Sequence, residues 1–482
     1  MKYLIFLPGQ FIPPLVSLLF VYTFTRVLAP AEYGIYAVVA SMVQLTTVAL
    51  FSWLQLSVKR FHAEATENGW VGKLTLSIYA GYGVCATLVM GVFVLFIGIT
   101  NPAEHLRSAY ILGLGLALAR AFSLITKSYR VGGLDGWRYS AMEASESLFG
   151  FLVALGLVAL LGWGARGLIV GVTVGALMPT LIDFPALVAR LRDAAWDEST
   201  VRKLLRFGAP FTIGYALEYV MSSSDRLLIQ HFMGESAVGI YAVAYTLAER
   251  GISAPFQALA LVSYPLLMRA MAVAGPDGAR LQAQSNLELV LALAGPAYVG
   301  FVIASPQIAA VLIGPAFTAE AATIMPWIAT GVFLACLRMH YLDHAFHLAQ
   351  RTDLVFYTAI PPAILNVVLN LVLLPRIGLQ GAVIAAVLAY ALAIVINAAV
   401  VWRLFPMPLA LPTMFKVLIA TAVMASVLHL LSFSATPAGL VGLVLTGAVV
   451  YGLLALALDI GAIRVRLRRV IMQGPSPTPP GT

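Results

Sequence analysis

Residues 74–99 read LTLSIYAGYGVCATLVMGVFVLFIGI and contain no charged side chain. The hydrocarbon core of a bilayer is about 30 Å thick and needs about 20 apolar residues in a helix. This stretch therefore predicts a transmembrane helix, and similar stretches recur along the whole chain. Hydrophobic residues make up 61% of the 482 residues and charged residues only 10%, which is too little charge to coat soluble domains. We expect an all-α integral membrane protein with no nucleic-acid partner.

The apolar stretches predict about fourteen transmembrane helices, separated by breaks too short to form a further domain. The expected limits are 4–27, 33–57, 74–99, 107–126, 140–163, 166–189, 205–230, 237–266, 286–313, 322–347, 353–375, 379–402, 412–431 and 437–459. The first stretch is longer than the apolar core of a signal peptide, so we interpret it as the first span.

The distribution of lysine and arginine predicts the orientation of these helices. If the N-terminus is cytoplasmic, almost all the cations of the loops and helix ends lie on the cytoplasmic side. Only Arg107, Arg166 and Arg376 then lie on the opposite side. This bias satisfies the positive-inside rule. We therefore expect both termini in the cytoplasm, with residues 464–482 forming a tail that is first basic and then disordered.

A short internal repeat predicts how the helices are arranged. YGIYAV at 33–38 returns as VGIYAV at 238–243, and Gly-Leu at 167–168 returns at 378–379. Because each half contains six helices, both enter the membrane in the same direction, which implies two lobes related by a pseudo-two-fold axis along the membrane normal. Gly34 should then superpose on Gly239. The expected parts are an N-lobe (1–190), a cytoplasmic linker (191–204), a C-lobe (205–403), two further helices (404–463) and the tail (464–482).

Several sequence features together resemble a known family. RVLAPAEYG at 26–34, KRF at 59–61 and VGIY at 238–241, in a chain of six plus six plus two spans, resemble the polysaccharide-transporter (Wzx-type oligosaccharide flippase) branch of the multidrug/oligosaccharidyl-lipid/polysaccharide exporter superfamily. The resemblance implies a protein of the bacterial inner membrane. It would move undecaprenyl-diphosphate-linked oligosaccharide from the cytoplasmic to the outer leaflet by alternating access, for O-antigen, capsule or exopolysaccharide biosynthesis. It also implies no enzymatic activity and no cofactor, with membrane lipids, a polysaccharide polymerase and chain-length proteins as expected partners.

Charged residues inside the spans are the candidates for function, because burying a charge in hydrocarbon costs about 2.5–3.5 kcal/mol or more. Arg120 lies deep in the 107–126 helix and has no acidic neighbour at helical spacing. Lys127 follows seven residues later on the same face. We expect Lys127 to extend to the membrane interface and Arg120 to face a cavity.

Other charges lie next to one another in the second half, as in Glu249-Arg250 and Asp225-Arg226. Adjacent residues on a helix point about 100° apart, so each must find a partner on another helix. These residues could form acid–arginine pairs that lock the lobes, or they could contact the substrate directly. The sequence leaves both interpretations open. The predicted cationic substrate path comprises Arg26, Lys59, Arg60, Arg120, Arg226, Arg250 and Arg338. The candidate gate or ion-coupling residues are Glu218, Asp225, Glu249 and Asp343.

His340, His344 and His347 share a helix face beside Asp343, which on paper could hold a metal. No helix motif of a metal site accompanies them, so we predict no metal, and a proton-coupling role for Asp343 or a histidine is the better alternative. Asn366 and Asn370, one turn apart, should bond between helices.

Gly167, Gly171 and Gly175 recur every four residues and should form a close-packing face.

Two rival functions remain. A cation-coupled multidrug antiporter of the same superfamily would require an acidic cavity to bind cations. The charges inside the predicted spans of this chain are instead balanced or basic. A membrane-embedded polysaccharide polymerase or ligase would want a long catalytic loop, and none is present between the predicted spans. Cys85 and Cys336 are too far apart in sequence for a cysteine metal motif or a disulfide framework.

Overall fold

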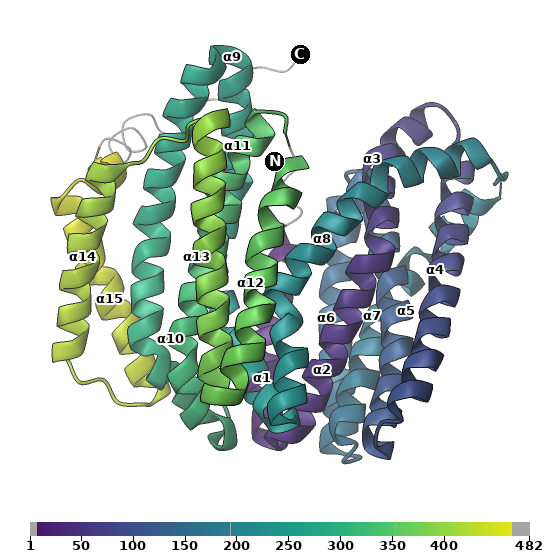
Figure 1. The fold of residues 1–482 in the computed structure, drawn as a ribbon, viewed down its shortest axis with the longest axis horizontal. Helices are drawn as coiled ribbons and strands as arrows, with labels where there is room; N and C mark the ends of the chain where they lie inside the picture. The colour runs from purple at the N-terminus through teal and green to yellow at the C-terminus, as the bar shows by residue number, and fades with distance from the viewer. Residues whose placement is uncertain (1–6, 193, 352, 465–482) are drawn as a thin grey trace. The chain divides into compact units, whose positions relative to one another are not determined.

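We analysed a computed structural model of the chain, which describes residues 7–192, 194–351 and 353–464 (Figure 1). The predicted disordered tail lies almost entirely outside these residues. Helices account for nearly all of the described chain, and no strand occurs in it. The predicted all-α class is therefore confirmed.

The helices follow one another with short connections. Their bounds are α1 Leu7–Val27, α2 Pro30–Thr46, the π-helical turn η2 Thr47–Phe51, α3 Ser52–Glu67, α4 Val71–Thr100, α5 Glu104–Gly132, α6 Gly136–Ala159, α7 Gly164–Leu191, α8 Glu198–Met233, α9 Glu235–Leu312, α10 Pro315–Leu337, the π-helical turn η3 Arg338–Leu342, α11 Asp343–Leu348, α12 Asp353–Ile377, α13 Leu379–Leu404, α14 Leu411–Leu430, α15 Pro437–Ala457 and the 3₁₀ turn η4 Ile460–Ala462. Within the described residues, each predicted span lies largely within one of these helices or within a continuous run of them.

Eleven helical stretches of the described chain are long and apolar enough to cross a membrane. One of them, α9, has 78 residues and contains two predicted spans. Its helical geometry breaks at Gly275, which has a φ of 65° and precedes Pro276. Glycine tolerates this left-handed φ, and the following proline cannot donate a helical hydrogen bond. The chain is thus a multi-pass membrane protein.

The chain forms two compact units. Unit 1 comprises Met1–Val243, Ile313–Phe317 and Ala359–Ala385. Unit 2 comprises Ala244–Leu312, Thr318–Thr358 and Ala386–Thr482. The predicted lobe boundaries and the two-fold relation of the complete halves stay predictions.

Within unit 1, the two copies of the repeat meet at their glycines. A Cβ atom at Gly34 would overlap the backbone carbonyl of Glu235, and a Cβ atom at Gly239 would overlap that of Pro30. Each glycine thus meets the residue one turn before the other glycine. Reciprocal contacts of this kind are what a two-fold axis produces, so the local packing agrees with the predicted repeat.

The predicted glycine face of α7 packs against α6. A Cβ atom at Gly171 would overlap Ala154, and one at Gly175 would overlap the carbonyl of Glu146. This confirms the close packing that the four-residue spacing predicts. This packing also holds the backbone of α6 next to α7. The acidic side chains Glu143 and Glu146 project from α6.

Candidate functional site

The most prominent charged cluster of unit 1 lies between α5 and α6. Lys127 of α5 donates to Glu143 over 2.7 Å and to Glu146 over 2.9 Å. Ser123 also donates to Glu146, over 2.9 Å. Lys127 is only 4% exposed, so our expectation that it extends to the interface is wrong. Two carboxylates from the neighbouring helix hold it in the interior, which the spacing along α5 alone could not reveal.

Arg120 lies at the other end of this cluster. Glu146 is within electrostatic range of its guanidinium, so the acid absent from the helical spacing of α5 is supplied by α6. Its Nε is buried and has no hydrogen-bond partner in the described part of the chain. Glu146 also binds Lys127 and Ser123. Arg120 is therefore compensated in charge at a distance and keeps unused hydrogen-bonding capacity.

A tyrosine of the repeat connects Arg120 with a second arginine. Tyr36 of α2 lies within electrostatic range of both Arg120 of α5 and Arg226 of α8. Tyr33, one turn earlier, is buried and also within range of Arg226. Unit 1 therefore places two arginines of the predicted substrate path within electrostatic range of the same tyrosine.

The remaining unit 1 cations of that path have exposed side chains. Lys59 and Arg60 are exposed on α3, and Lys59 is within electrostatic range of Lys127 and Glu143. Arg26 is exposed, its guanidinium 3.7 Å from the centre of the Tyr22 ring. The side chain of Glu218 lies outside the described residues.

Asp225 of α8 occupies a different polar site in unit 1. Its Oδ2 accepts a hydrogen bond from the hydroxyl of Tyr241 at 2.8 Å, and its Oδ1 accepts one from Nδ2 of Asn370 at 2.8 Å. Asn366 accepts from Ser224 at 3.3 Å. Asp225 is 1% exposed and both asparagines are fully buried. The asparagines thus bond between helices as predicted, and they converge on a buried carboxylate.

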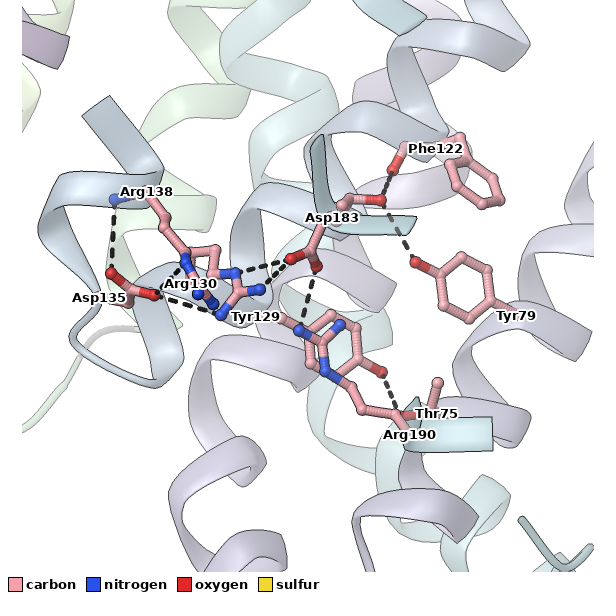
Figure 2. A network of polar contacts seen from close by, with 10 residues as sticks. Thr75, Tyr79, Phe122, Tyr129, Arg130, Asp135, Arg138, Asp183 and Arg190 are labelled. Carbon is pink, nitrogen blue, oxygen red and sulfur yellow. Dashed lines mark hydrogen bonds and ion pairs between the residues drawn. The ribbon is translucent and has the colours of Figure 1, made fainter. Parts of the chain in front are cut away.

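A third polar network ties α5 to α7 (Figure 2). Asp183 of α7 accepts hydrogen bonds from Arg130 of α5, including one from Nε at 2.8 Å, and from Nη2 of Arg190 at 3.0 Å. Arg190 also stacks 4.5 Å above the ring of Tyr129, whose hydroxyl donates to Thr75 at 3.2 Å. The Asp183 side chain is completely buried. Two arginines on one buried carboxylate form a cross-link between helices.

The network continues to the surface through Asp135. Its carboxylate lies 3.2 Å from Nη1 of Arg130 and 3.7 Å from Nε of Arg138. Asp135 also caps the N-terminus of α6, where Oδ1 accepts from the backbone N–H of Arg138 at 3.4 Å. An N-cap carboxylate stabilises the exposed N–H groups of a helix start. These contacts fix the turn between α5 and α6.

Unit 2 holds the other predicted residues. Arg338 is 2% exposed and lies 3.4 Å from Asp343, which also accepts from Asn397 at 2.6 Å. These three residues form a buried group that joins η3 and α11 to α13. Glu249 is exposed, whereas Nε of its neighbour Arg250 is buried and has no hydrogen-bond partner among the described residues.

The three histidines of unit 2 pack against aromatic rings. His340 stacks on Phe256 with ring centres 5.8 Å apart. His344 and His347 lie 5.1 and 5.8 Å from the ring of Tyr264. Within the described ranges, no group of three His, Cys, Asp or Glu side chains is arranged to hold a metal.

Several of these partners were missed in the sequence. Asp183 is a single acid inside a span, and Arg190 lies seven residues later on the same face. Glu143 and Glu146 are one turn apart and share a face of α6. Helical spacing could have indicated both sets. Nothing in the sequence indicated that Tyr36 and Tyr241 would lie beside charges of opposite sign.

Comparison with known proteins gives a family match and a shared fold. A family model described as polysaccharide biosynthesis protein matches residues 2–271. A sequence comparison with curated proteins finds no match. The solved structure of the lipid II flippase MurJ in an inward closed conformation aligns with a TM-score of 0.74 and 14% identity, covering 96% of this chain and 100% of that chain.

Two further solved structures share the fold over most of their length. An inward-facing multidrug resistance MATE family transporter of the MOP superfamily aligns with a TM-score of 0.66 and 15% identity, over 83% of this chain and 98% of that chain. A MOP superfamily transporter from Pyrococcus furiosus aligns with a TM-score of 0.56 and 17% identity, over 84% and 94%. At sequence identities this low, the structural similarity shows a common fold and nothing more.

Proposed function

Because the chain belongs to the polysaccharide biosynthesis protein family, we propose that it is a flippase for undecaprenyl-diphosphate-linked oligosaccharide. It moves this lipid from the cytoplasmic to the outer leaflet of the bacterial inner membrane, for the assembly of surface polysaccharide. Polysaccharide polymerase and chain-length proteins would act on the product and are the proposed partners. Alternating access is the proposed mechanism, and both termini are cytoplasmic. A reporter fused at Thr200 that proves active on the periplasmic side would overturn this orientation.

The observation that supports this proposal best is the pair of arginines within electrostatic range of Tyr36. Arg120 keeps an unpartnered, buried Nε, and Arg226 lies within range of the same tyrosine. A diphosphate carries about two negative charges and must exchange its hydration for protein donors on entering the membrane. Arginine binds phosphate oxygens in a bidentate manner. The two side chains thus supply the charge and the donors that this headgroup needs.

The neighbouring acids explain why such a site would release its cargo. Glu146 partly compensates Arg120 and fully engages Lys127. A cation that already interacts with a protein carboxylate gains less from an incoming phosphate than an isolated cation does. Passage requires binding that is strong enough to admit the headgroup and weak enough to let it leave. In this proposal Glu146 competes with the phosphate for Arg120, so that Arg120 releases the headgroup after each transfer.

We assign the coupling of transport to an ion to Asp225. It is a buried carboxylate that accepts hydrogen bonds from the neutral donors Tyr241 and Asn370, with Arg226 within electrostatic range. Buried acids in transporters commonly face an ion pathway. By contrast, Asp343 has Arg338 as an ion-pair partner at 3.4 Å, which favours a structural pair for these two residues.

A reconstituted system tests the proposal against its rivals. Purified protein is placed in proteoliposomes that contain lipid-linked oligosaccharide, and the fraction of glycan open to an external glycosidase is followed over time. We expect this fraction to rise above the half that the outer leaflet contains at the start. Glycan that stays protected, together with transport of a cationic dye by the same vesicles, would identify a multidrug antiporter instead. Growth of the glycan chain or its transfer to another lipid would identify a polymerase or ligase.

A further inference from the structure

Unit 1 contains a polar cavity that none of the polar networks above includes. Ser52, Gln55 and Lys59 of α3 follow one another at helical spacing and share a face. Tyr215 and Tyr219 of α8, four residues apart, also share a face. Together with the apolar side chains of Val48 and Leu56, these residues line a cavity of about 400 Å³. Pockets for small ligands start at about 300 Å³.

Contacts on either side of the cavity hold its walls in place. Gly208 of α8 packs against the backbone of Trp53. Towards the other end, the hydroxyl of Tyr219 donates to the carbonyl of Ser41 at 2.8 Å, which fixes the direction of its ring. The π-helical turn η2 directly precedes the cavity residues of α3. Turns of this kind change the direction of helical side chains and are common at functional sites.

Apart from Tyr219, the polar side chains of the cavity have no bonding partner among the described residues. Ser52, Gln55, Lys59 and Tyr215 make no side-chain hydrogen bond or ion pair within the part of the chain that the structure describes. Unpaired polar groups within membrane-spanning helices are costly and occur where a cavity holds water or a ligand. Among the residues that the structure describes, no acidic side chain lines the cavity, and Lys59 is its one charged group, so the described lining favours a neutral or anionic ligand.

These groups match a sugar. The amide of Gln55 and the hydroxyl of Ser52 can each donate and accept, as sugar hydroxyls require. The rings of Tyr215 and Tyr219 offer flat apolar faces with a polar tip, against which the C–H face of a pyranose can pack. Lys59 adds one cation, and it lies within electrostatic range of Lys127 and Glu143. The cavity therefore adjoins the charged cluster that ends at Arg120.

We propose that this cavity binds the sugars that directly follow the diphosphate of the lipid-linked oligosaccharide. The inference depends on the proposed flippase function and locates the part of unit 1 that recognises the glycan. In the proposed orientation the cavity lies in the cytoplasmic half of the membrane, where the cargo enters. Gln55 and Tyr215 determine which glycan is accepted, while Lys59 contacts the phosphate next to the first sugar.

The test compares two probes on the full-length protein in nanodiscs. One is lipid-linked oligosaccharide extracted from the source bacterium, and the other is undecaprenyl diphosphate, which carries no sugar. The wild type should bind the first more tightly. Gln55→Ala and Tyr215→Ala should each weaken binding of the glycan-bearing lipid by about tenfold, the value of one good hydrogen bond or stacking contact. Binding of undecaprenyl diphosphate should change by no more than about twofold.

Controls separate recognition from loss of fold. Tyr357→Ala replaces a tyrosine that is 59% exposed on α12 and should leave both affinities unchanged. Tyr215→Phe keeps the ring and should retain most of the glycan binding that Tyr215→Ala loses.

Three results would overturn the inference while leaving the flippase function intact. The two probes could bind the wild type equally, the variants could weaken both probes by one factor, as a phosphate site would, or the variants could bind both as the wild type does. A wild type that binds neither lipid would reject the proposed function itself.

Discussion

Tyr36 and Tyr241 occupy the same place in the two copies of the Gly-Ile-Tyr-Ala-Val segment, at 34–38 and 239–243. Tyr36 lies near two arginines, Arg120 and Arg226. Tyr241 instead donates its hydroxyl to the buried carboxylate of Asp225 at 2.8 Å. The repeat therefore preserves the glycine and the tyrosine. The neighbouring helices place positive charge near Tyr36 and a carboxylate against Tyr241. We infer that the first copy serves an anionic cargo and the second a coupling cation.

The largest loss of unfolding free energy is expected in the Asp183 network. This loss is the reference against which the smaller effects at the two tyrosine sites are compared. Asp183→Ala leaves Arg130 and Arg190 buried without their shared carboxylate. Removal of one partner from a buried ion pair costs about 3–5 kcal/mol of unfolding free energy, measurable as a lower thermal midpoint in detergent. Asp135→Ala is the matched control, since Asp135 binds the same Arg130 but keeps 34% of its side chain exposed. Equal losses for the two variants would mean that burial does not determine the strength of the network.

Arg120→Ala tests the cationic side of the comparison. A hydrogen bond to a charged group is worth about 1.5–3 kcal/mol, so we expect export to fall by roughly tenfold to a hundredfold. Lipid-linked precursor should accumulate while the protein level stays normal. Arg120→Lys should partly restore export, because it returns the charge without the planar donor group. Arg107→Ala, an exposed arginine on the same helix, is the control, and normal export by Arg120→Ala would remove the cationic path from the mechanism.

Asp225→Asn tests the other side. Asparagine keeps an acceptor for Tyr241 but loses the charge that a coupling cation would neutralise. We expect transport in proteoliposomes to become independent of an imposed sodium or proton gradient and to fall by about tenfold. Asp277→Asn, whose side chain is 89% exposed, should keep the full gradient response. If Asp225→Asn still responds to the gradient as the wild type does, coupling occurs elsewhere.

The two tyrosines can be compared directly by removing each hydroxyl. Tyr241→Phe loses a hydrogen bond to a buried carboxylate and should cost about 1.5 kcal/mol of unfolding free energy. The Tyr36 hydroxyl makes no hydrogen bond in the described part of the chain, so Tyr36→Phe should stay within about 0.5 kcal/mol of the wild type. Chemical unfolding in mixed micelles measures both. Equal costs would show that the two rings have equivalent environments.

Asp197 offers a half-buried carboxylate outside the predicted spans, with the smallest expected effect. Hydrogen bonds from Thr200 and Ser199 hold the pKa of Asp197 below its ordinary value. A lowered folded-state pKa stabilises the protein above the unfolded pKa of about 3.9, and this contribution is lost as the pH falls through the folded pKa. The small difference in thermal midpoint between wild type and Asp197→Asn should therefore disappear on acidification. A difference that grows at low pH would contradict this assignment.

The sequence predicted the membrane helices well because apolar length is a property of each segment alone. The same is true of the contact faces at Gly171 and Gly175, whose spacing follows from helix geometry. Lys127 was assigned wrongly because its partners, Glu143 and Glu146, belong to another helix. Asp183 was missed for the same reason. Spacing along one helix indicates which residues share a face, but the partner on the facing helix depends on how the helices pack.

The crossing of α2 and α9 at Gly34 and Gly239 has a mechanical consequence. Main chain touches main chain there, since neither position has room for even a methyl group. Crossings held by interlocking side chains resist rotation, because ridges of one helix fill grooves of the other. Two bare backbones share no such ridges, so we expect the angle between these helices to change at lower cost than their separation. The crossing would then act as a hinge between the two helices. Tyr36 and Tyr241 each lie two residues beyond it, so a rotation at the crossing would move both tyrosines.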